Sequence, residues 1–314
     1  MVADSQVDTL PSRQRGIAAE EFDVKPQRHP FRWLAAIVIL VVAAQLVYGA
    51  ATNTRLAWDV VGKYLLHPDI LAGLQITIGL ALISQVVATI LGVALALMAL
   101  SRNPVLVVGA RLYIQVFRTV PTIVQMMFWY YLAAVVPTVG IGIPFGSTFI
   151  NFTTNELITQ FVAALFGLAL GEAAFLAEYF RGGIISVPRG QIEAAASCGL
   201  TPARTFRRIV VPQAMRVILP AYGNQFIVNI KNTSVVFVIG AGDLMTRAQL
   251  IYSQNFQQIP LLIVVICWYL ILVSLLTLVQ RRVETHYSRG YGDRPARRKV
   301  YETLNAKARL LQRK

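Results

Sequence analysis

Strongly apolar stretches alternate along the chain with shorter polar segments. A run of roughly 18 or more apolar residues is long enough to cross the hydrocarbon core of a bilayer as a helix. The pattern therefore predicts an all-α fold, a polytopic bundle of about six membrane-spanning helices. These predicted spans cover approximately residues 33–52, 72–100, 112–137, 158–180, 214–240 and 258–280.

The third predicted span is less uniform than the others. It opens with Arg111 and Arg118 and contains Pro121. A proline has no backbone N–H, so inside a helix the carbonyl four residues earlier needs another partner. We predict irregular backbone near the start of this span.

Composition agrees with a membrane protein. Of the 314 residues, 56% are hydrophobic and 14% are charged, and the mean hydropathy is +0.58. Soluble domains carry about a quarter charged residues, so the chain is predicted to be integral to a membrane. The net charge of +14 does not indicate nucleic-acid binding, because the basic residues flank the apolar segments.

Basic residues lie mostly on one predicted side of the membrane. They fill the N-terminal tail, the loop before the third span, the long loop after the fourth span and the C-terminal tail. The opposite loops hold only Arg55, Lys63 and Arg247. By the positive-inside rule, both termini and the long loop are predicted to face the cytoplasm.

These assignments divide the chain into four segments. Residues 1–32 form a cytoplasmic tail, 33–70 a first helix with an outer loop, 71–285 the main transmembrane domain, and 286–314 a basic cytoplasmic tail. The first tail is too long and too acidic for a signal peptide, so the first helix is predicted to be retained. For the last tail, a disordered segment and a helix lying on the anionic inner leaflet stay open.

Residues for catalysis or metal binding are not grouped in the sequence. Cys198 and Cys267 are too few for a disulfide scaffold, and His29, His67 and His286 have no metal-ligand spacing. No Ser/His/Asp set is evident, and no Gly-x-x-x-x-Gly-Lys-Ser/Thr run occurs that could hold ATP phosphates. We predict a non-catalytic chain with no cofactor or metal of its own.

The long loop over residues 181–212 is predicted to be helical on the water side of the membrane. Gly199 can take the left-handed conformation that ends a helix. Thr201 then reads as an N-cap followed by Pro202 in the first turn of a second helix, which is predicted to end at Pro212. A structured loop of this kind indicates a docking surface for a partner.

The same loop carries the pattern Glu-Ala-Ala, three residues, Gly, nine residues, Ile, one residue, Leu-Pro, with Val211 in place of the leucine. This pattern resembles the membrane subunits of bacterial ABC importers, in which the loop is a coupling helix that sits in a groove of the ATPase. The resemblance implies a type I ABC importer-like permease fold. By the resemblance, the coupling residues are Glu193, Ala194, Ala195, Gly199, Arg204, Arg207, Arg208, Ile209 and Pro212.

Further segments resemble the polar amino-acid branch, the histidine/glutamine/arginine-type permeases. Residues 117–121 read Phe-Arg-Thr-Val-Pro against Phe-Arg-Gly-Thr-Pro in the branch, and residues 231–234 read Lys-Asn-Thr-Ser against Lys-Asp-Thr-Ser. Residues 177–191 are similar almost throughout. The chain departs from the branch within these motifs, and it has one span more than the commoner five-span form. These departures bear on which solute is carried and not on the class of transporter.

The resemblance implies an ATP-driven importer of a polar amino acid. Its partners would be an ABC ATPase dimer that holds ATP and Mg²⁺, a second permease subunit (the same or a related chain), an extracytoplasmic solute-binding protein and membrane lipid. Closure of the ATPase dimer would move the loop over residues 193–212 and turn the bundle from inward-open to outward-open. Nucleic acid is not among the predicted partners.

Charged side chains inside predicted spans are costly and normally paired or turned to a cavity. Glu178 and Arg181 are three residues apart on one helix and are predicted to form a structural pair. Glu172 and Lys231 lie deeper. Two interpretations stay open, an ion pair between spans four and five and a lining of the solute pathway.

Uncharged polar residues give further pathway candidates, with helix–helix hydrogen bonding as the alternative. Together with the two deep charges, the candidates are Glu172, Gln125, Asn224, Lys231, Thr233 and Ser234.

Two rival functions call for features that the sequence does not offer. A stand-alone secondary transporter or channel calls for internal repeats or discontinuous helices, and no repeat is evident across the halves. A membrane enzyme calls for a catalytic set that the chain does not offer.

Overall fold

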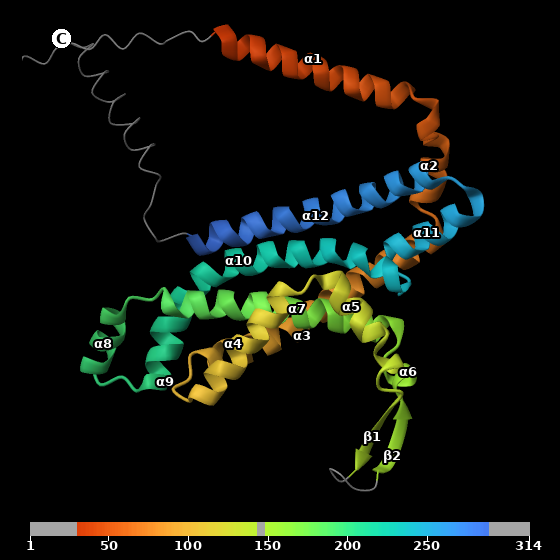
Figure 1. Cartoon of the computed structure of the whole chain (residues 1–314). Helices are drawn as coiled ribbons and strands as arrows, with labels where there is room; N and C mark the ends of the chain where they lie inside the picture. The colour runs from red at the N-terminus through yellow and green to blue at the C-terminus, as the bar shows by residue number, and fades with distance from the viewer. Residues whose placement is uncertain (1–29, 143–147, 289–314) are drawn as a thin grey trace, which may run out of the picture. The chain divides into compact units, whose positions relative to one another are not determined.

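The computed structural model describes residues 30–142 and 148–288, most of them helical (Figure 1). The helices are α1 (Pro30–Thr52), η1 (Thr54–Leu56), α2 (Trp58–Leu65), α3 (Pro68–Ala99), α4 (Pro104–Thr119), α5 (Thr122–Tyr130), η2 (Leu132–Ala134), α6 (Thr154–Leu157), α7 (Gln160–Ile185), α8 (Arg189–Ser197), α9 (Pro202–Thr205), η3 (Phe206–Val210), α10 (Val211–Asn232), η4 (Thr233–Ile239), α11 (Leu244–Asn255) and α12 (Gln258–Ser288). The strands are β1 (Thr138–Gly142) and β2 (Thr148–Thr153). The predicted tails covered residues 1–32 and 286–314, and of these, residues 1–29 and 289–314 lie outside the described residues.

The chain separates into two units, Met1–Leu56 and Ala57–Lys314. In the first unit, the described part is α1 with η1, and α1 is apolar and exposed all round. Such a helix is suited to lipid contact on every side. The second unit contains every other described element, including α2, which the sequence division grouped with the first helix.

Four described helices are long and apolar enough to cross a membrane, namely α1, α3, α7 and α12. A fifth span is available if Pro202–Ile239 and Leu244–Asn255, bent by 43° at a short break, count as one. The polytopic helical bundle is thus confirmed, and its span count of about six is approximate. The predicted third span forms two shorter helices, because α4 ends at Thr119 and α5 begins after Pro121.

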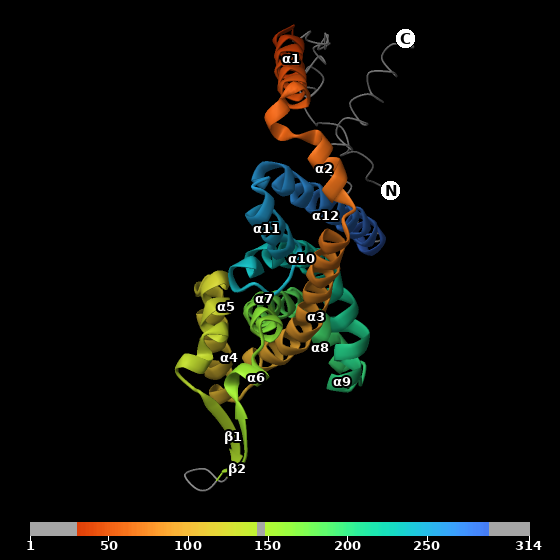
Figure 2. The same cartoon turned by 90° about the vertical axis from the view of Figure 1, so that its right-hand side faces the viewer.

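Helix α7 is the centre of the bundle. It contacts α3, α4, α5 and α10, and both views show it enclosed by these helices (Figures 1 and 2). Its buried residues are mostly alanine and glycine. Small residues let helix backbones approach closely, which membrane helices need because lipid provides no hydrophobic drive for their association.

Three glycines, two on α7 and one on α3, lie where α7 comes closest to a neighbouring helix. A Cβ on Gly167 would lie 3.0 Å from the Cα of Met126 in α5. A Cβ on Gly92 of α3 would lie 2.9 Å from Leu176, and one on Gly183 would lie 2.4 Å from Ile218 of α10. Glycine is therefore required where α7 crosses three of its neighbours.

Between α5 and α7 the chain forms a β-hairpin that the all-α prediction did not contain. Strands β1 and β2 pair antiparallel, with Val139 opposite Phe152 and an irregularity at Ile141/Gly142. Apolar residues alternate with Thr, Gly and Asn over Thr138–Gly142 and over residues 150–153, the period of two that suits a strand, and the adjacent Phe149 falls at the irregularity. The segment is too short to compete with the helical spans in a hydropathy pattern. Its connecting residues 143–147 are not described.

We expect Gly167→Ala to lower the melting temperature of the detergent-purified protein. The added methyl would meet Met126 backbone, and overpacking of this kind costs about 1–3 kcal/mol. Gly182→Ala, on the same helix with open space around its Cβ, is the matched control. Thermal unfolding followed by tryptophan fluorescence compares the two, and equal melting temperatures would refute the close-packing argument.

Candidate functional site

The predicted coupling loop has two helical arms joined at Gly199. Helix α8 ends with Gly199 at φ +75°, and the next N–H, that of Leu200, donates to the carbonyl of Ala195 at 3.1 Å. This arrangement is the glycine-terminated helix end that the sequence predicts. Thr201 then caps α9, because its Oγ1 accepts a hydrogen bond from Arg204 N at 3.4 Å.

The sequence predicted that the second arm ends at Pro212, but the helix continues past this residue. Helix α9 continues through the π-helical turn η3 into α10, and Pro212 lies in the first turn of α10. The Val211 N–H reaches back to the carbonyl of Phe206, five residues earlier. This wider turn and the first-turn position accommodate a proline without breaking the helix.

An open groove separates the two arms. The Gln213 amide donates to Gln191 Oε1 at 2.5 Å and to the Ile209 carbonyl at 3.0 Å, which ties α10 to α8. Ala195 is buried at this contact, whereas Ala194 on the same helix is exposed. The groove is lined by Gln191, Ala194, Ala195, Cys198, Leu200, Arg208, Ile209, Pro212 and Gln213.

The basic residues of the loop face solvent. Arg204, Arg207 and Arg208 are exposed, as are Glu193 and Gly199. Figures 1 and 2 show α8 and α9 together beyond one end of the bundle helices. The loop therefore forms an exposed elbow of α8, α9 and η3, and its second arm is continuous with α10.

Glu178 and Arg181 form the ion pair that their spacing predicts. Arg181 Nη2 lies 2.7 Å from Glu178 Oε2, and Arg181 Nε lies 3.3 Å from Glu178 Oε1. Both side chains are partly exposed, so the pair lies at the surface of the bundle and not in its core.

Glu172 lies buried between α7 and α10 and does not pair with Lys231. Its Oε2 accepts a hydrogen bond from Gln225 Nε2 at 3.0 Å, and Gln225 Oε1 accepts one from the Tyr179 hydroxyl at 3.1 Å. Glu172 Oε1 has no partner among the described residues. Lys231 is exposed, because six residues along α10 turn it by about 240° from the direction of Gln225. Of the two interpretations that the sequence left open, the ion pair between Glu172 and Lys231 is therefore not formed.

The other polar candidates of α10 and η4 divide between surface and interior. Asn224 is exposed, and the hydroxyl of half-buried Ser234 donates to the Lys231 carbonyl at 2.7 Å. Thr233 is buried, and its hydroxyl lies 3.2 Å from that of Tyr269 in α12. The structure thus does not bring these residues together at one site.

Gln125 donates hydrogen bonds to two backbone carbonyls at the break between α4 and α5. Its Nε2 donates to the carbonyl of Phe117 at 3.0 Å and to that of Val120 at 2.9 Å. Phe117 is four residues before Pro121, so its carbonyl is the one that loses a helical partner to the proline. The Gln125 side chain is buried, and its amide N–H groups are occupied by these hydrogen bonds.

Several buried polar residues were not predicted from the sequence, and Asn229 and Asp243 are two of them. Asn229 Nδ2 donates to Ser84 Oγ at 3.0 Å and Gln85 Oε1 at 3.2 Å, which joins α10 to α3. Asp243 caps α11 by accepting from the N–H groups of Met245 and Thr246. Asp243 follows two glycines, a signal for an N-cap after a break, whereas Asn229 has no local signal because its partners are more than 140 residues away.

Residues 88–289 match the family described as binding-protein-dependent transport system inner membrane component. The chain belongs to this family. Two similar relatives are the arginine transport system permease protein ArgU of Corynebacterium glutamicum and the probable amino-acid permease protein YxeN of Bacillus subtilis. ArgU is 37% identical over 270 residues, 85% of this chain and 84% of ArgU. YxeN is 35% identical over 224 residues, 71% of this chain and 93% of YxeN.

A solved structure of an amino acid ABC transporter with histidines is similar to this permease in fold and sequence. The TM-score is 0.60 at 30% identity, over 70% of this chain and 94% of the other. The predicted family and type I importer fold are confirmed. The chain is the permease subunit of an ABC importer for amino acids and works with an ABC ATPase.

We expect Glu172→Gln to leave assembly of the permease intact and to lower solute-stimulated transport. The substitution keeps the side-chain volume and one acceptor for Gln225, whereas packing makes no use of the second carboxylate oxygen. Glu172→Ala removes the acceptor from a buried amide, at about 1–3 kcal/mol, and is expected to lower the melting temperature. A Gln variant that no longer assembles would assign Glu172 to packing alone.

Proposed function

We propose that this permease imports a polar amino acid and takes its mechanical drive through the α8–α9 elbow. The observation that carries the proposal is the continuity of α9, η3 and α10, because a push on the elbow is then a push on a membrane helix. An ABC ATPase dimer, which holds ATP and Mg²⁺, docks on the elbow, and its closure rocks the bundle from inward-open to outward-open. This chain itself is non-catalytic.

The remaining partners are those that membership of the family suggests. A second permease subunit, the same or a related chain, completes the pore, and an extracytoplasmic binding protein delivers the solute. ArgU is an arginine transport permease by name, which supports a polar amino acid as the solute class.

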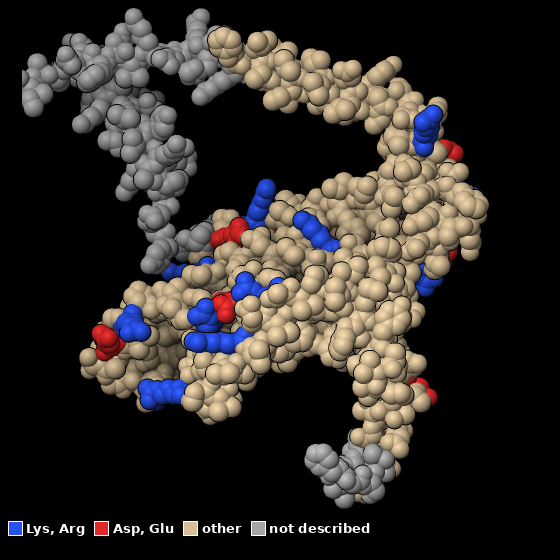
Figure 3. Space-filling model, viewed as in Figure 1, with Lys and Arg blue, Asp and Glu red and all other residues tan. Residues whose placement is uncertain are grey.

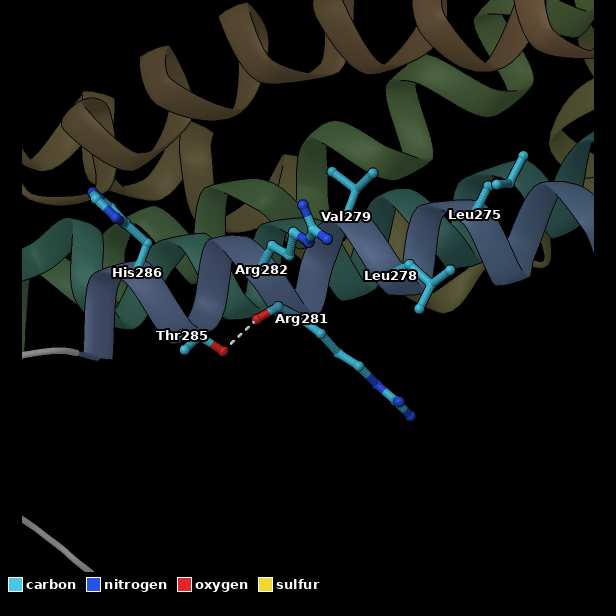
Figure 4. Close-up of a pocket in the computed structure, with 7 residues that line it drawn as sticks. All are labelled: Leu275, Leu278, Val279, Arg281, Arg282, Thr285 and His286. Atoms are coloured by element: carbon cyan, nitrogen blue, oxygen red, sulfur yellow. Dashed lines mark hydrogen bonds between the residues drawn. The ribbon is translucent and has the colours of Figure 1, made fainter.

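The elbow and both termini face the cytoplasm in this proposal. At the end of α12, apolar Leu275 and Leu278 give way to Arg281 and Arg282, and Arg281 points away from the side that Arg282 takes (Figure 4). Cations on both sides of a helix end, directly after an apolar run, suit a cytoplasmic membrane boundary.

Reconstitution tests the proposal. The chain is purified with its co-expressed ATPase, inserted into proteoliposomes and supplied with candidate binding proteins. ATP-dependent uptake of a labelled amino acid, absent without the binding protein, is the expected result. Uptake by the chain alone, driven by an ion gradient without ATP, would instead support a stand-alone secondary transporter.

We expect Gly199→Val to uncouple ATP hydrolysis from transport. A valine at φ +75° is strained by about 1–2 kcal/mol, so the two arms must change their relative direction. Gly190→Val is the matched control, since both glycines have open space around the new Cβ and only Gly199 is left-handed. The ratio of solute imported to ATP hydrolysed is measured for both. An unchanged ratio in Gly199→Val would remove the elbow from the coupling mechanism.

A further inference from the structure

A pair of glutamine side chains joins the first arm of the elbow to α10. Gln191 is the third residue of α8, and Gln213 is the third residue of α10. The Gln213 amide donates to Gln191 Oε1, and the two residues are 22 positions apart in the chain. Gln213 is half-buried and Gln191 is exposed. The Gln191–Gln213 link therefore connects the first turn of one arm to the first turn of the helix that follows the other arm.

The same amide also spans the junction between η3 and α10. Pro212 has no N–H to give to the helical hydrogen bonds, and the π-helical turn before it is wider than an α-helical turn. Gln213 Nε2 donates to the Ile209 carbonyl within this turn at 3.0 Å. An amide NH2 group has two hydrogens, so Gln213 can serve Ile209 with one and Gln191 with the other.

The described residues offer no other polar link between the two arms. Glu193 on α8 and Arg204 and Arg208 on the second arm are exposed, and Figure 3 shows acidic and basic atoms on the elbow, at the lower left. No ion pair of the described residues joins these charges across the arms. The Ser197 hydroxyl donates to a carbonyl of its own arm, and the Thr201 hydroxyl accepts from an N–H of its own arm.

Apolar packing holds the second arm more firmly than α8. Val187 packs with Val210 of η3 and Ala214 of α10 in one buried cluster. On α8, by contrast, Ala195 is the buried residue. Gln213 lines the groove between the arms and also a second hollow that α12 borders. Without the glutamine link, α8 would be free to turn about its two ends while η3 and α10 stay in place.

We propose that Gln213 is a positioning residue for energy coupling, which joins α8 to α10 through Gln191 so that the elbow moves as one unit. This inference rests on the proposed function, in which an ATPase docks on the elbow. A displacement of α8 then reaches α10 directly through the Gln191–Gln213 link. The longer route runs through Gly199, α9 and the widened turn η3, each of which can bend.

The test separates the two hydrogen bonds of the amide. Gln213→Leu removes both bonds, whereas Gln191→Leu removes only the bond between α8 and α10. Gln191→Glu is the conservative variant, because its carboxylate can still accept from the Gln213 amide. Gln254→Leu is the matched control, since it makes the same change at an exposed glutamine of α11, outside the elbow.

Each variant is purified with its co-expressed ATPase and reconstituted with the binding protein. Labelled L-arginine, L-histidine and L-glutamine are screened first on wild type, and the best is used throughout. Size-exclusion chromatography measures assembly, and initial uptake and ATP hydrolysis are measured on the same vesicles. The readout is the ratio of solute imported to ATP hydrolysed.

Gln191→Leu is expected to lower this ratio about 2- to 10-fold, the factor that corresponds to the loss of one neutral hydrogen bond. Gln213→Leu lowers it at least as much, and both variants still assemble. Gln191→Glu and Gln254→Leu keep the wild-type ratio. A purely structural role of Gln213 at the η3 junction would leave Gln191→Leu unaffected.

A reversible cross-link tests the same inference within one folded protein. Gln191→Cys and Gln213→Cys are combined with Cys198→Ser and Cys267→Ser, which remove the two native thiols. A short bis-methanethiosulfonate linker then replaces the Gln191–Gln213 link, and a reductant removes the linker. The linked protein is expected to regain the wild-type ratio, and the reduced protein is expected to match Gln191→Leu.

Three results would overturn the inference. The first is an unchanged ratio in both leucine variants. The second is a linked protein that imports no more solute per ATP than its reduced form. The third is loss of assembly in Gln213→Leu with normal coupling in Gln191→Leu, which would assign the amide to the folding of η3 alone. Failure of wild type to import any of the three amino acids would count against the proposed function instead.

Discussion

The close packing of α7 against its neighbours is the constraint on which the bundle depends. Glycine and alanine along α7 let α3, α5 and α10 approach until an added methyl at Gly92, Gly167 or Gly183 would collide. Lipid provides no hydrophobic drive for helix association, so dense van der Waals contact over this small-residue surface must provide the attraction. The polar bonds of Glu172 and Asn229 depend on the same approach, because they bridge helices that these crossings bring together.

The breaks in the bundle are stabilised by side chains from elsewhere in the fold. Gln125 donates to the Phe117 carbonyl in place of the N–H that Pro121 lacks, and Thr77 of α3 accepts the Leu244 N–H at 3.0 Å where α11 begins after the break. Backbone groups without a partner inside a membrane cost several kcal/mol, so each break needs such a replacement. Gln125 therefore illustrates how a polar residue within a span can serve the backbone, although its sequence position alone suggested a pathway.

Local features of the sequence predicted the local features of the structure. The turn at Gly199, the cap at Thr201 and the Glu178–Arg181 pair all follow from residues within a few positions of one another. Features that join distant segments were not predictable in this way. The Glu172 partner is Gln225 and not Lys231, because the choice depends on how α7 and α10 are rotated against each other, and hydropathy does not fix that rotation.

Helix α7 also connects the buried polar contacts of the bundle to the elbow. It leads through Ser186 into α8, and the chain returns to the bundle as α10. A displacement of the elbow therefore acts on both α7 and α10, the two helices that hold Glu172 and Gln225 between them.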